Sequence, residues 1–113
     1  MTIQEKNWDV IQGDIWDQYI TISDANGPID LSGYTFIAEV RDKDGGSVVC
    51  STLTLNNGIT HAGAGTIYMK FTAAQTHNFT FPKARYQVQA IDGDLNPRTL
   101  EIGWLNVKAG VIA

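Results

Sequence analysis

Acidic side chains are the residues of this chain whose types could support catalysis. Four of them would supply paired carboxylates for glycoside hydrolysis if the fold gathered them in one cleft: Asp9, Asp14, Asp17 and Glu101. Their positions along the chain give no sign of such a gathering. The serines lie outside any nucleophile-elbow pattern, and the Gly63-Ala64-Gly65 run precedes a strand-like segment rather than a helix. The sequence therefore predicts no catalysis.

Metal-ligating residue types are present, but they lack the spacing of a metal site. His61 and His77 have no cysteine or histidine partner at zinc spacing. Asp42-Lys43-Asp44-Gly45 and Asp92-Gly93-Asp94 match calcium loops only in part, because neither carries the full set of spaced oxygen ligands. Aspartate and glycine are also ordinary residues of hairpin turns. We expect no bound metal and no cofactor.

Cys50 is the single cysteine, so an intrachain disulfide is excluded. This fits a protein made in a reducing cytoplasm. A nucleophilic cysteine needs a base or a cationic neighbour, and the flanking sequence offers none. We interpret Cys50 as a small, half-buried strand residue.

Size and charge narrow the classes of function. With 113 residues the chain is expected to form one domain, and 43% hydrophobic residues are enough for a single core. The net charge of −4 and the scattered basic residues argue against direct nucleic-acid binding. No apolar run approaches the length of a membrane helix, and the N-terminus lacks the apolar segment of a secretion signal.

The elements that must position these residues are short strands with a two-residue hydrophobic period. Residues 16–23 place Trp16, Ile20 and Ile22 on one face. Residues 34–41, 66–71 and 85–92 alternate in the same way. In the last predicted strand, residues 98–107, the pattern places Leu100, Ile102 and Trp104 on one face, and Trp104 is interpreted as a core residue.

Turn signals separate these strands, and one short helical turn is expected near residues 72–77. Thr72 and Gln75 have capping-box spacing. The pattern predicts an all-β fold, an immunoglobulin-like antiparallel β-sandwich of about seven or eight strands. Residues 1–113 form one domain in this prediction, with residues 1–7 and 109–113 as flexible or partner-docking tails.

Large side chains that the pattern leaves outside this core are the candidates for a protein interface. Ile37 lies among the outward residues of its strand, and Tyr19 does the same. Trp8 and Trp16 are interpreted either as core residues or as aromatic anchors. A sugar-stacking platform made by Trp8, Trp16 or Tyr19 is a further alternative. The complete candidate set is Trp8, Trp16, Tyr19, Ile37, Val111 and Ile112.

Several short motifs occur in an order that is typical of one protein family. They are Gln12-Gly13-Asp14, Ile20-Thr21-Ile22-Ser23-Asp24, Gly27-Pro28-Ile29-Asp30-Leu31-Ser32-Gly33-Tyr34, Glu39-Val40-Arg41-Asp42-Lys43, Gly65-Thr66-Ile67, Thr72-Ala73-Ala74-Gln75-Thr76, Ala84-Arg85-Tyr86 and Ile91-Asp92-Gly93-Asp94. This order resembles the small β-sandwich structural proteins of tailed bacteriophages, notably the N-terminal domain of siphophage upper baseplate proteins. The similarity spans residues 10–108.

The resemblance implies a non-enzymatic virion protein, made in the host cytoplasm, that binds other virion proteins as a symmetric homo-oligomer. It implies a tail or baseplate adaptor that mediates assembly or fibre attachment. Upper baseplate proteins continue into stalk regions, whereas this sequence ends at Ala113. A capsid decoration protein and a carbohydrate-binding β-sandwich module therefore remain as alternatives, and no membrane or nucleic-acid partner is expected.

Overall fold

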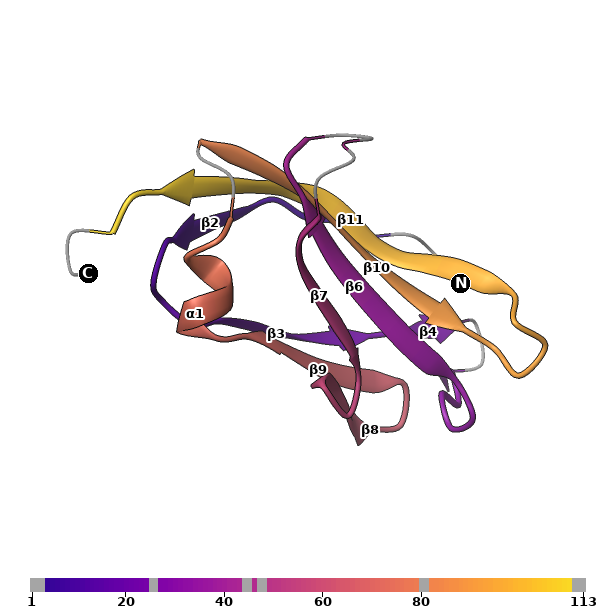
Figure 1. Cartoon of the computed structure of the whole chain (residues 1–113). Helices are drawn as coiled ribbons and strands as arrows, with labels where there is room; N and C mark the ends of the chain where they lie inside the picture. Colours follow the sequence, from indigo (N-terminus) through magenta and orange to yellow (C-terminus); the bar gives the residue numbers. More distant parts are fainter. Residues whose placement is uncertain (1–3, 25–26, 44–45, 47–48, 80–81, 111–113) are drawn as a thin grey trace.

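Short strands make up nearly all regular structure of the chain, as the alternating sequence predicts. A computed structural model describes residues 4–24, 27–43, 46, 49–79 and 82–110 (Figure 1). Its elements are β1 (Gln4–Glu5), β2 (Trp8–Ile11), β3 (Trp16–Thr21), β4 (Ser23–Asp24), β5 (Gly27–Pro28), β6 (Thr35–Arg41), β7 (Val49–Leu55), β8 (Gly58–Gly63), β9 (Thr66–Phe71), α1 (Ala73–Thr76), β10 (Lys83–Ile91) and β11 (Pro97–Lys108). The predicted all-β class is confirmed.

One sheet folds over on itself to make the two layers of a sandwich. The strand order is β1-β11-β10-β6-β7-β8-β9-β3, and β2 also pairs with β11. Figure 1 shows β11, β10, β6 and β7 in one layer, with β3, β9 and β8 facing them and α1 at one end. The chain crosses between the layers at the turn after β7, where Asn56 and Gly58 adopt positive φ of 65° and 100°.

Among the described residues, three strand pairings are parallel, which the antiparallel prediction did not include. β7 pairs with β8 over two residue pairs, and both β1 and β2 run parallel to β11. The backbone N–H of Lys6 donates to the carbonyl of Ile102 at 3.2 Å, and Asn7 Oδ1 accepts from the N–H of Trp104 at 3.0 Å. Residues 4–7 thus lie along β11 and are not a flexible tail, while residues 1–3 are outside the described part.

Inward faces follow the predicted period in most strands. β3, β9 and β10 alternate strictly between buried and outward residues, and Gln18 joins the buried side of β3. The interior is filled with aromatic rings: Trp16 stacks on Phe71 at 5.2 Å between centroids and meets Phe79 and Tyr86 edge-on. At the end of β9, Thr72 and Gln75 form the predicted capping box of α1.

A β-bulge inverts the predicted faces of β11, and a further bulge lies in β7. In β11, Leu100 is an extra residue between the pairs Gln89–Thr99 and Val88–Glu101. Glu101 therefore turns into the core with Leu100, while Ile102 and Trp104 turn outward, so their assignment to the core is wrong. In β7 the extra residue is Cys50, and Val49 is 41% exposed.

Candidate functional site

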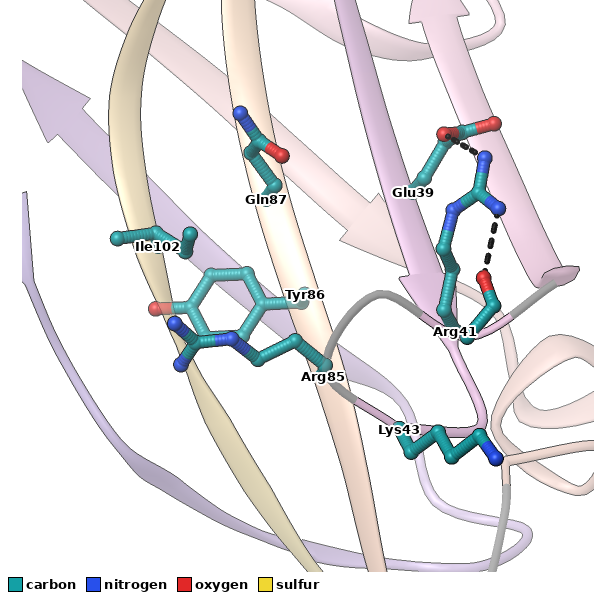
Figure 2. A pocket seen from close by; sticks show the side chains of 8 residues that line it. Glu39, Arg41, Lys43, Arg85, Tyr86, Gln87 and Ile102 are labelled. Atoms are coloured by element: carbon teal, nitrogen blue, oxygen red, sulfur yellow. Dashed lines mark hydrogen bonds and ion pairs between the residues drawn. The ribbon is translucent and has the colours of Figure 1, made fainter. Parts of the chain in front are cut away.

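A hollow opens on the outer face of β6, β10 and β11 (Figure 2). Its volume is about 380 Å³. Three basic side chains and one acidic side chain line it, together with backbone and apolar groups. The lining residues, which we call the cationic hollow, are Glu39, Arg41, Lys43, Gly46, Arg85, Tyr86, Gln87 and Ile102.

Strand pairing places two arginines opposite each other in the cationic hollow. Arg85 of β10 lies directly across from Arg41 of β6. Like charges at such positions repel, and each guanidinium is held by a different group. Arg41 bonds Glu39 at 3.1 Å and the carbonyl of Gly46 at 2.8 Å, whereas Arg85 lies over the ring of Trp104 at 4.9 Å. Figure 2 shows the two side chains splayed apart, so the hollow lies between them.

A buried polar cluster lies on the inner side of the same strands. Glu101 Oε2 accepts from Gln18 Nε2 at 2.6 Å and from the Tyr86 hydroxyl at 2.8 Å, and Trp8 Nε1 donates to that hydroxyl at 3.0 Å. Burial raises the pKa of Tyr86, and the hydrogen bond to Glu101 adds to the shift. Gly103 lies opposite Tyr86, and a Cβ there would overlap the carbonyl oxygen of Lys6.

The outer face of β3 and β9 carries a second aromatic group. Tyr19, 65% exposed, lies opposite Tyr68 with 4.9 Å between ring centroids. The Tyr68 hydroxyl donates to Asp17 Oδ2 at 2.6 Å, and this bond is the main cause that raises the pKa of Tyr68 to about 12. Two tyrosine rings beside a carboxylate form a small platform at an edge of the sheet, because β3 ends the strand order.

The interface residues that the sequence predicted differ in how far the structure exposes them. Trp16 is only 7% exposed and belongs to the core, so of its two interpretations the core residue holds and the surface anchor does not. Trp8 is half-buried against that core, while Tyr19 is well exposed. Ile37 is half-buried on the outer face beside Glu39, Gln87 and Gln89. Val111 and Ile112 lie outside the described residues.

The four carboxylates with potential for catalysis do not share a cleft. Glu101 is buried inside, whereas Asp9, Asp14 and Asp17 are exposed. Within the described residues, no group of three histidine, cysteine, aspartate or glutamate side chains could hold a metal ion.

Local hydrogen bonds account for the partial calcium motif in the last hairpin. Asp92 Oδ1 accepts from the backbone N–H groups of Asn96 and Asp94 at 3.0 and 2.9 Å. The bond from Asn96 is the main cause that holds the pKa of Asp92 below its usual range. This aspartate therefore shapes a turn.

Sequence reasoning missed Arg41, Arg85 and Trp104. Scattered along the chain, Arg41 and Arg85 gave no basic run, and the two-residue period placed Trp104 in the core. The antiparallel pairing of β6 with β10 brings the arginines together, and the bulge in β11 turns Trp104 to their side. The sequence carried no local signal for this bulge, because the period places Glu101 on the outward side, where a charge is expected.

No described helix is long and apolar enough to cross a membrane. No protein-family model matches the chain, and no curated protein is found as a relative.

Proposed function

We propose that this chain is a non-enzymatic structural protein of a tailed-bacteriophage virion, an adaptor of the tail or baseplate that binds neighbouring subunits or attaches fibres. The observation that carries the proposal is that the basic residues and the large exposed residues lie on the outside of the sandwich. The basic residues, Trp104 and the most exposed apolar residues lie on outer faces and turns, while the interior is sealed by aromatic packing. Such a surface suits protein contacts better than the turnover of a substrate.

The edges of the sheet support the same role. β11 is covered by β1 and β2, whereas β3 ends the strand order and pairs along one side with β9. An open strand edge is a ready partner for another chain. The assignment to a bacteriophage rests on the ordered sequence resemblance to upper baseplate domains. The same resemblance supports synthesis in the host cytoplasm and assembly into the virion.

Analysis of purified particles tests this proposal. Mass spectrometry of virions produced by the genome that encodes the chain should detect it in a fixed ratio to the other structural proteins. Immunogold labelling should mark tails, and labelling of heads would favour a decoration protein instead. Absence from purified particles would refute the virion role.

The tyrosine platform favours a second candidate function, carbohydrate binding. Tyr19 and Tyr68 offer stacking area, and Asp17 offers a hydrogen-bond acceptor beside them. A glycan array should then show hits that disappear in Tyr19→Ala. Tyr34→Ala, a half-buried tyrosine elsewhere, is the matched control. An array without hits would remove this candidate.

A further inference from the structure

The turn between β10 and β11 holds an apolar side chain out in solvent. We call residues 92–96 the acidic tip. Leu95 is 81% exposed, and its φ of 64° lies in the left-handed region that non-glycine residues seldom adopt. Neither the exposure nor the backbone conformation favours the stability of the isolated chain. Asp94, next to it, is also exposed and adds a negative charge.

Hydrogen bonds fix the shape of the acidic tip. Asp92 Oδ1 accepts two backbone N–H groups, and the N–H of Leu95 donates to the carbonyl of Asp92 at 3.0 Å. The tip therefore holds the exposed residues Asp94 and Leu95 at adjacent positions of an ordered turn. A preformed contact loses less entropy on binding than a mobile loop would.

The cationic hollow has the complementary character. Arg41, Lys43 and Arg85 give it an excess of positive charge in a chain whose net charge is −4, and Ile102 supplies an apolar wall. Arg41 and Arg85 stand directly across from each other, and their side chains point apart (Figure 2). A carboxylate that enters the space between them would accept charge-assisted hydrogen bonds.

The tip cannot reach the hollow of its own chain. Arg85 lies at the start of β10 and Asp92 follows its end, so about 20 Å of extended strand separates them. We propose that the acidic tip of one copy docks into the cationic hollow of a second copy. Asp94 bonds Arg85 or Lys43 there, and Leu95 packs against Ile102 and Trp104.

This contact is head-to-tail, because each copy offers one tip and one hollow. Repetition of such a contact closes a ring or extends a filament. The inference builds on the proposed assembly role and names a second copy of the chain as one partner. A chain present in virions but monomeric in the experiment below would refute only this inference.

Two variants test the docking: one has substitutions only in the cationic hollow, and the other has substitutions only in the acidic tip. The hollow variant is Lys43→Glu with Arg85→Glu, and the tip variant is Asp94→Ser with Leu95→Gly, where glycine suits the positive φ. At about 20 mM salt, sedimentation velocity should show association of the wild type that rises with concentration. Each variant alone should associate at least tenfold more weakly. An equimolar mixture should form heterodimers and nothing larger, since one intact tip meets one intact hollow.

Controls separate docking from general effects. Lys70→Glu reverses a charge on the other layer, and Ile15→Ser removes an apolar side chain that is 57% exposed away from the tip; both should associate like the wild type. About 0.5 M salt should disperse the wild type, because the Debye length falls to about 4 Å. If the Arg85 change prevents folding, Lys43→Glu with Arg85→Gln replaces it. A monomeric wild type at low salt, or a mixture without heterodimers, would overturn the proposal.

Discussion

Two tyrosine–carboxylate pairs of this sandwich share one geometry and differ in burial. Tyr86 bonds Glu101 inside the core, and Tyr68 bonds Asp17 on the outer face. In each pair the two residues are diagonal neighbours on adjacent antiparallel strands. Glycine lies opposite the buried tyrosine, whereas another tyrosine lies opposite the exposed one. The same tyrosine–carboxylate hydrogen bond therefore stabilises the fold strongly when it is buried away from water. When it is exposed to water, it contributes little stability and mainly orients side chains on the surface.

Removing the buried carboxylate is expected to have the largest effect. Glu101→Ala leaves donors of Gln18 and Tyr86 without their acceptor and opens a cavity, so the free energy of unfolding should fall by about 3 kcal/mol. Chemical denaturation measures the loss. Glu101→Gln keeps an acceptor and the shape, so it should lose less. Equal losses in the two variants would show that the negative charge itself matters.

A methyl group at Gly103 should come second. Its Cβ would overlap the backbone of Lys6 and approach the Tyr86 ring, so Gly103→Ala should cost about 2 kcal/mol through strain. Gly93→Ala is the matched control, because no atom lies within 4 Å of its Cβ position. Comparable thermal unfolding midpoints for the two variants would contradict the close packing beneath the buried pair.

The hydroxyl of the buried pair should matter somewhat less. Tyr86→Phe keeps the ring and removes the group that links Trp8 to Glu101, which should cost about 1.5 kcal/mol in the free energy of unfolding. Tyr34→Phe should remain within about 0.5 kcal/mol of the wild type, as for most partly exposed positions. Denaturant midpoints measure both variants, and an unchanged midpoint for Tyr86→Phe would count against the buried network.

The exposed pair should show the smallest effect, visible mainly in alkaline solution. The pKa of Tyr68 is raised to about 12, so the native state holds this proton more tightly than the unfolded state does. The resulting stabilisation is complete below the ordinary tyrosine pKa of 10.0 and is lost as pH rises through about 12. Asp17→Asn should lower the pKa of Tyr68 towards its ordinary value in an NMR titration.

The control for that titration is another exposed aspartate. Asp14→Asn should leave the pKa of Tyr68 at about 12, because Asp14 makes no contribution to its shift. If both variants titrate alike, the hydrogen bond to Asp17 is not the main cause of the shift.

Local patterns predicted much of the fold. The faces of β3, β9 and β10 and the capping box of α1 all follow from residues close together in sequence. Each depends on backbone geometry that a few neighbouring residues determine, such as strand alternation or an N-cap hydrogen bond. The candidate site was predicted less well. Tyr19 is exposed as expected, but Trp16 is in the core, and the arginines of the cationic hollow were missed.

The sequence by itself determined that this protein is an all-β sandwich and which side chains most of its strands bury. Only the tertiary structure decided the register. One extra residue at Leu100 buries Glu101 and turns Trp104 outward towards Arg85. A bulge exists only relative to the partner strand, which lies elsewhere in the chain, so no local period reveals it. The separate pairing of β6 with β10 places Arg41 beside Arg85, although the two are far apart in sequence.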